Sequence, residues 1–168
     1  MARLVLVGLP GVGKSTVARA LAARWACDWC DTDDLVAVRV GVTVGELLRT
    51  RGEAALRDVE LDVLREALAS ESVVATGGGV VSRPAARTLL RGEPTIWLDC
   101  ADEVALSRVS GGDRPLLGRG SPRRLGRAAR APRDVVSRGV ARARRHRHGL
   151  DEVVAAVIDA SGRTAPCG

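Results

Sequence analysis

Short apolar runs alternate with longer segments of helical periodicity along most of the 168 residues. Five apolar runs predict strands, over residues 3–7, 27–30, 72–76, 94–99 and 139–144, of which the last is the poorest. Between them, apolar positions recur every three or four residues and predict helices over residues 14–25, 53–69, 102–109, 123–130 and 151–160. Strands that alternate with helices indicate βαβ units around a parallel sheet, an α/β fold.

Two further helices are predicted from their start signals. Thr43 is followed three residues later by Glu46, which matches a capping box, so a helix should begin there. Ser82 can cap another helix that has Pro84 in its first turn.

Length and composition fit one globular domain spanning residues 1–168. Aromatic residues make up only 2% of the chain, which weakens any model based on stacking single-stranded nucleic acid. The longest apolar stretch, residues 4–9, is far below the roughly 18 residues that cross a bilayer. The first residues lack the features of a signal peptide, so we expect a cytoplasmic protein with no membrane partner.

The charge of +6 is unevenly distributed. Residues 105–150 contain thirteen Arg and two Asp, which suggests an anionic ligand or a nucleic acid. Of the 26 basic residues only Lys14 is a lysine. This bias towards Arg affects the whole chain, so the one remaining Lys indicates a position where Arg does not easily substitute.

Residues 8–15, Gly-Leu-Pro-Gly-Val-Gly-Lys-Ser, match the phosphate-loop pattern G-x-x-x-x-G-K-S and lie between a predicted strand and a predicted helix. Glycines let successive backbone N–H groups turn inward around an anion, and the helix N-terminus adds its positive end. Lys14 can reach the β- and γ-phosphates, and the Ser15 hydroxyl is a hard oxygen ligand for Mg²⁺. A glycine-rich turn before a structural helix is the weaker alternative.

Asp31 and Asp33 follow the second predicted strand and, in an extended segment, would point the same way. Ligands of open α/β sheets bind beyond the carboxyl ends of the strands, where the phosphate loop also lies. These carboxylates could bind Mg²⁺ through water, or hold or deprotonate an acceptor hydroxyl. Helix capping by Asp33 or Asp34 is the structural alternative. Asp99, at the end of the fourth strand, is a rival Mg²⁺ ligand.

Other candidates lie on helices and loops. Arg57 and Glu60 are one helical turn apart, so an ordinary surface pair competes with a binding role for Arg57. Three consecutive glycines, residues 77–79, could let the backbone approach a ligand closely. Arg114 lies in a Gly/Pro-rich loop that is typical of a lid, while for Arg114 and Arg130 alike a solvated charge is the alternative.

Taken together, these residues resemble the shikimate kinases, in family order and at near-family spacing. The matching segments are residues 8–16, 31–33, 52–60, 77–79, 114–117 and 130–132. The resemblance implies a three-layer α-β-α P-loop kinase fold with a five-stranded parallel sheet and a mobile lid at about residues 111–122. It also implies transfer of the ATP γ-phosphoryl group to the 3-hydroxyl of shikimate, in chorismate and aromatic amino-acid biosynthesis.

The resemblance further implies a role for each matching residue. It implies that Lys14, Asp33 and Arg114 are catalytic and that Ser15 and Asp31 support Mg²⁺. The nucleotide-binding residues would be Gly11, Val12, Gly13, Lys14, Ser15, Thr16 and Arg114. The shikimate-binding residues would be Asp33, Arg57, Gly78 and Arg130. Planar Arg groups suit a carboxylate on the substrate.

The chain departs from the family pattern at two aromatic positions, which are Leu56 and Asp134 here. A related P-loop kinase for another small polyol or hydroxy acid is therefore the alternative function. A nucleic-acid-binding module is the weakest hypothesis, because the chain has no such motif. The expected partner is a small-molecule substrate, and we expect a monomer. The adenine-contacting Arg falls between residues 145 and 149, with Arg147 as the candidate.

Overall fold

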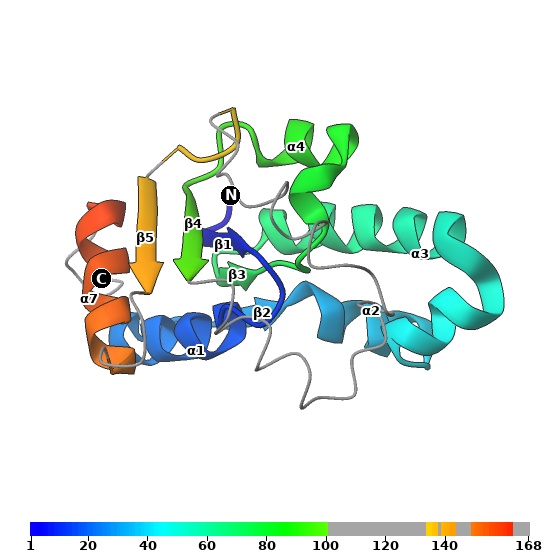
Figure 1. Cartoon of the computed structure of the whole chain (residues 1–168), viewed down its shortest axis with the longest axis horizontal. Coiled ribbons are helices and arrows are strands. Elements are labelled where there is room, and N and C mark those ends of the chain that lie inside the picture. The colour runs from blue at the N-terminus through cyan, green and yellow to red at the C-terminus, as the bar shows by residue number, and fades with distance from the viewer. Residues whose placement is uncertain (101–133, 138, 144–148, 163–168) are drawn as a thin grey trace.

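The computed structural model describes residues 1–100, 134–137, 139–143 and 149–162. Within them, five parallel strands form one sheet in the order β2-β3-β1-β4-β5 (Figure 1). The strands are β1 (Leu4–Gly8), β2 (Trp29–Asp31), β3 (Val73–Ala75), β4 (Thr95–Cys100) and β5 (Gly139–Ala143). The predicted parallel α/β sheet is thereby confirmed, and every predicted strand is present with ends shifted by at most two residues.

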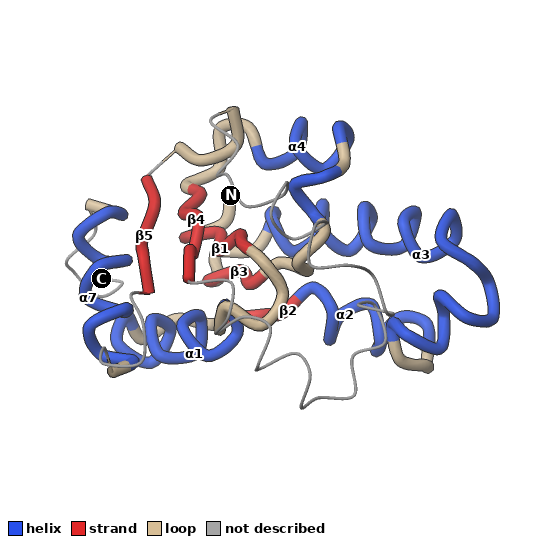
Figure 2. The backbone as a smooth tube through the Cα atoms, in the orientation of Figure 1, coloured by secondary structure: helices blue, strands red, loops and turns tan. Residues whose placement is uncertain are grey.

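Helices lie on both faces of this sheet (Figure 2). They are α1 (Lys14–Trp25), α2 (Thr32–Val40), α3 (Val44–Ala69), α4 (Pro84–Leu90) and α7 (Leu150–Ser161), with a short 3₁₀ helix η1 (Val80–Ser82). Alternate residues of a strand point to opposite faces, so β1 contributes to two apolar layers. Leu4 and Leu6 pack with α1 and α7, whereas Val5 and Val7 pack with α3 and α4. The predicted three-layer α-β-α arrangement is confirmed.

The helix α2 was not predicted. The polar residues 31–34 were interpreted as the end of a strand, but the chain turns into a helix directly after Asp31. The Asp31 carboxylate caps this helix by accepting a hydrogen bond from the Asp33 backbone N–H at 2.9 Å. The prediction that Asp31 and Asp33 point the same way from one extended segment is therefore wrong, because Asp33 lies in the first turn of α2. The predicted cap was Asp33 or Asp34, and the cap observed is Asp31.

Two predicted helices, from Thr43 and over residues 53–69, form the single element α3. Thr43 caps it as predicted, since its hydroxyl accepts a hydrogen bond from the Glu46 N–H at 3.1 Å. At Gly52 the backbone leaves helical geometry, with φ 78° and ψ 175°, so α3 bends there. The predicted cap Ser82 is wrong: its hydroxyl donates to the Gly79 carbonyl at 2.6 Å, and Arg83 occupies the N-cap position of α4.

Several predicted features lie outside the described residues. These are the helices at residues 102–109 and 123–130, the lid at residues 111–122, and the side chains of Arg114, Arg130 and Arg147. Among the described helices, none combines the length and the apolar character that a membrane crossing needs.

Candidate active site

The phosphate-loop sequence connects β1, the central strand of the sheet, to α1. Gly13 is the N-cap of α1 with φ 96°, a left-handed conformation that glycine adopts without strain. Lys14 and Ser15 are the first residues of α1, so the N-terminus of this helix lies at the loop. The context that confirms a phosphate-binding loop, a buried strand before it and a helix after it, is therefore present.

Lys14 is held inside the loop although it carries a charge. The residue is only 8% exposed. Its Nζ donates to the carbonyl oxygens of Gly8 at 3.0 Å and Leu9 at 2.9 Å. These bonds compensate the ammonium group for the loss of water. The loop thus fixes a compact positive charge beside the backbone N–H groups that begin α1.

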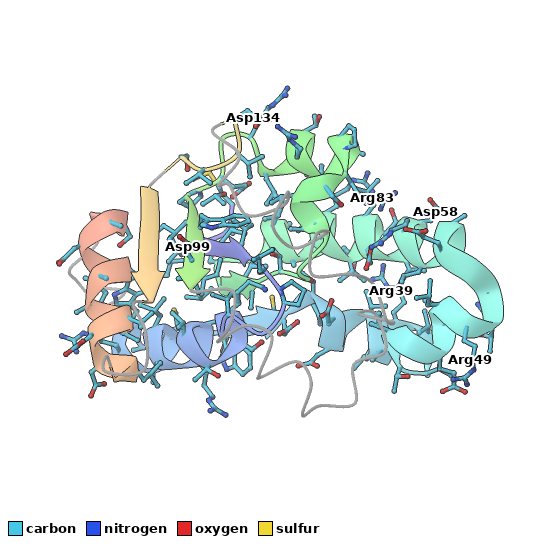
Figure 3. All side chains as sticks on the ribbon, viewed as in Figure 1. Arg39, Arg49, Asp58, Arg83, Asp99 and Asp134 are labelled. Carbon is cyan, nitrogen blue, oxygen red and sulfur yellow. The ribbon has the colours of Figure 1, made fainter. Side chains whose placement is uncertain are left out.

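The structure brings Ser15 and Asp31 together. One Asp31 oxygen caps α2, and the other accepts a hydrogen bond from the Ser15 hydroxyl. Asp31 is 8% exposed. A hydroxyl and a carboxylate at the phosphate loop form a pair of hard oxygen donors, the type that Mg²⁺ prefers. The rival residue Asp99 lies near the end of β4 (Figure 3).

The three glycines after β3 touch three separate parts of the site. A Cβ atom added to Gly77 would lie 2.6 Å from Asp33 Oδ1, and one added to Gly78 would lie 2.5 Å from the Pro10 ring. An added Cβ on Gly79 would lie 3.5 Å from an Arg57 guanidinium nitrogen. The turn therefore lies close to the phosphate loop, to α2 and to α3. A side chain at residue 78 would collide with the ring and backbone of Pro10, whereas one at residue 77 would require the Asp33 carboxylate to turn away.

Arg57 is held by carboxylates on its own helix. Its guanidinium donates to Glu60 at 2.8 Å and to Glu53 at 3.0 Å. Partial burial acts to lower the pKa of Arg57, but the hydrogen bonds and charges of Glu60 and Glu53 outweigh it and raise the pKa above its ordinary value. The predicted pair with Glu60 exists, and Gly79 lies next to the same guanidinium.

A pocket opens beside Asp33, between the glycine turn, α3 and α4. It is a partly open hollow, whose volume is about 330 Å³ when the space open to solvent is counted. Its lining residues are Thr32, Asp33, Glu60, Leu61, Leu64, Gly77, Val80, Arg83 and Ala86. The pocket combines an apolar wall with two carboxylates and one guanidinium, which suits a small polar molecule.

Some residues of this site were not predicted. Glu53 precedes Arg57 by four residues, so the i,i+4 spacing could have identified it as a second partner. Thr32 accepts a hydrogen bond from the Gly77 N–H at 2.9 Å, and Arg83 lines the pocket. Both contacts join segments distant in sequence, and no local pattern indicates them.

The two departures from the family pattern have structural explanations. Leu56 is fully buried and packs with Val36 of α2 and Leu47 of α3. Asp134 forms ion pairs with Arg87, whose Nε donates at 3.0 Å, and with Arg91 at 3.7 Å. An apolar contact and an ion pair therefore occupy the two positions, and both lie outside the lining of the pocket.

The ion pair of Asp134 predicts a pH-dependent contribution to stability. The hydrogen bond from Arg87 holds the pKa of Asp134 below its ordinary value of about 3.8. A depressed carboxyl pKa stabilises the folded state above that value, and the contribution is lost as pH falls through the folded-state pKa. We expect Arg87→Met to lower the melting temperature at pH 7 by no more than a few degrees, because the pair is exposed. Thermal unfolding at pH 7 and pH 3 should show the difference shrinking in acid, and an equal difference at both values would contradict this origin.

A parallel sheet with a phosphate loop after its central strand defines the P-loop class of nucleotide-binding enzymes. A small pocket lined by the carboxylate of Asp33 and the guanidinium of Arg83 points within this class to the kinases that act on small molecules. Arg57 does not line this pocket and lies next to it, at Gly79.

The family model described as shikimate kinase matches residues 10–161, and the chain belongs to the shikimate kinase family. A shikimate kinase of Corynebacterium glutamicum is 36% identical over 158 residues, which cover 92% of this chain and 94% of that protein. The resemblance drawn from the motifs is thereby confirmed. Members of this family are ATP-dependent phosphotransferases that act on an alcohol group.

Solved structures support the same assignment. The shikimate kinase of Bacteroides thetaiotaomicron has a TM-score of 0.78 and 27% identity, and the match covers 93% of this chain and 96% of that one. The shikimate kinase of Acinetobacter baumannii, solved in complex with shikimate, has a TM-score of 0.74 and 26% identity, with 95% and 88% covered.

Proposed function

We propose that this chain transfers the γ-phosphoryl group of ATP to the 3-hydroxyl group of shikimate, with Mg²⁺ as the metal. The observation that carries the proposal is the glycine turn, residues 77–79, which lies close to Pro10, Asp33 and Arg57. The turn thus gathers a phosphate loop, a carboxylate and a guanidinium around one place. An acceptor that carries hydroxyls and a carboxylate matches these groups.

On the nucleotide side, Lys14 and the backbone N–H groups at the start of α1 bind the phosphates. Gly11, Val12, Gly13 and Thr16 complete the loop and the first turn of α1 in this proposal. The ammonium group would exchange its bonds to the Gly8 and Leu9 carbonyls for bonds to phosphate oxygens. Because the loop already fixes Lys14, little reorganisation is needed as charge develops on the transferring group.

The residues present fit a magnesium ion. Ser15 and Asp31 offer two adjacent hard oxygens, and Mg²⁺ in such sites is bound by one or two protein oxygens together with phosphates and water. When bound, the ion would neutralise charge on the phosphates. Among the described residues no group of three His, Cys, Asp or Glu could hold a metal elsewhere.

On the acceptor side, Asp33 faces the glycine turn and the pocket. Its carboxylate accepts hydrogen bonds from substrate hydroxyls and accepts the proton of the attacking one. Arg57, held in place by Glu60 and Glu53, pairs with the substrate carboxylate. Gly78 presents backbone at the same place, and Arg114 and Arg130, outside the described residues, would complete the phosphate and carboxylate contacts.

The same proposal includes a monomer that works in the cytoplasm. Lys14, Asp31, Asp33, Arg57 and the glycine turn all come from one chain, which supports a site that needs no second copy.

The proposal is tested by coupling ADP formation to acceptor addition. Purified protein with ATP and Mg²⁺ should form ADP only when shikimate is added, and removal of Mg²⁺ should stop the reaction. Gluconate, an open-chain hydroxy acid, serves as the alternative acceptor. Turnover with gluconate and none with shikimate would assign a different kinase activity.

A further inference from the structure

Arg83 lies where α4 begins and contacts the helix that carries Arg57. Its guanidinium donates a hydrogen bond from Nη1 to the backbone carbonyl of Arg57, 26 residues earlier in the chain. Figure 3 shows Arg83 between α4 and α3. Arg83 also lines the pocket together with Asp33 and Gly77. This side chain therefore links the segment that follows the glycine turn to α3 beside the candidate site.

Arg83 differs from Arg57 and Arg87, two other partly buried arginines, in its partners. Arg57 pairs with Glu60 and Glu53, and Arg87 pairs with Asp134. In the described part of the chain no carboxylate forms an ion pair with Arg83, and its guanidinium donates to the Arg57 carbonyl. A long cationic side chain is costly to order for one backbone hydrogen bond at a surface site, so its placement in the pocket wall indicates a function.

We infer that Arg83 is a positioning residue: through its bond to the Arg57 backbone it holds Arg57 at the glycine turn, where Arg57 receives the substrate carboxylate. The inference rests on the proposed function, because it takes a carboxylate-bearing acceptor as the ligand of Arg57. The two ends of Arg57 are then fixed separately. Glu53 and Glu60 fix the guanidinium, and Arg83 fixes the backbone.

Loss of the Arg83 bond should weaken the binding of shikimate and leave the binding of ATP unchanged. Arg83 bonds to α3 and lines the acceptor pocket, whereas the phosphate loop is built from β1 and α1. Loss of the bond should let α3 shift relative to the glycine turn, and a small misplacement of a binding group weakens the reaction strongly. The effect should appear in the KM for shikimate, while kcat and the KM for ATP stay close to those of the wild type.

The test compares three single variants with the wild type in the shikimate-dependent assay. Arg83→Met removes both the donor and the charge and should raise the KM for shikimate roughly tenfold. Arg83→Lys keeps a donor of similar reach and should recover most of this loss. Arg91→Met removes a charge from the exposed segment after α4 and should change neither KM. Melting temperatures of all variants show whether they are folded.

A double variant separates a positioning role from direct binding. If Arg83 acts through Arg57, then Arg83→Met in an Arg57→Met background should change kcat/KM by less than about twofold. A further tenfold loss would show an independent contact with the substrate and overturn the inference. An unchanged KM for shikimate in Arg83→Met, or equal changes in the KM values of both substrates, would also overturn it. Absence of shikimate-dependent turnover in the wild type would instead refute the proposed function, and the inference with it.

Discussion

Replacement of Asp33 by Asn should reduce kcat for phosphoryl transfer to shikimate by about 10² to 10⁴-fold, the usual contribution of a general base. The substitution keeps the shape of the side chain, so the close contact with Gly77 persists. The amide, however, cannot take up the proton of the attacking hydroxyl, and it turns a hydrogen-bond acceptor into a donor. Steady-state kinetics with varied shikimate, together with direct titration of ATP, measure both effects.

ATP affinity should stay within a few-fold of the wild type in this variant, because Asp33 belongs to α2 and the proposed phosphate site is at the start of α1. Asp34→Asn is the matched control: it is the next residue of the same helical turn, is exposed, and does not line the pocket. Near-normal kcat in Asp33→Asn would show that Asp33 is not the base. Equal losses in both variants would point to a general effect of charge near α2.

Replacement of Lys14 by Arg should lower kcat/KM for ATP by at least about 10²-fold, even though the charge is kept. The ammonium group lies between the carbonyl oxygens of Gly8 and Leu9 in a residue that is 8% exposed. A planar guanidinium is larger and cannot occupy that space without displacing the loop. Kinetics with varied ATP and a titration of the nucleotide measure the loss.

The matched control is the opposite substitution, of an arginine by a lysine, on the same helix. Arg19→Lys, at an exposed position of α1, should leave the kinetics unchanged. Arg supplies 25 of the 26 basic residues, so activity in Lys14→Arg comparable to the wild type would show that the single lysine is not required by the geometry of the loop.

The centre of the sheet was predictable because β1, β3 and β4 are short apolar runs with their own flanking signals. A strand buried on both faces needs such a run whatever its partners. The helix α2 escaped prediction for a physical reason: its β-branched residues Val36, Val38 and Val40 have weak helical propensity. It forms because Asp31 caps it and because Val36 is buried against α3. A local cap and a tertiary contact, rather than intrinsic helical propensity, determine this element.

The candidate site also has one part that the sequence predicts and one part that it does not. The phosphate loop is contiguous, so its residues could be identified from spacing alone. The acceptor side is assembled from α2, the glycine turn, α3 and the start of α4, and its contacts are long-range. Motif order indicated Asp33 and Arg57, but the bond between Arg83 and the Arg57 backbone could not be derived from either local sequence.

A chain with a single lysine has one side-chain primary amine, and here that amine belongs to the phosphate loop. Among the side chains of these 168 residues, reagents that acylate amines can therefore modify the ε-amino group of Lys14 alone. Because carbonyl oxygens enclose this group, its rate of labelling in the free protein should be low. The nearly lysine-free composition thus gives the loop a chemical label of its own, without any substitution elsewhere in the chain.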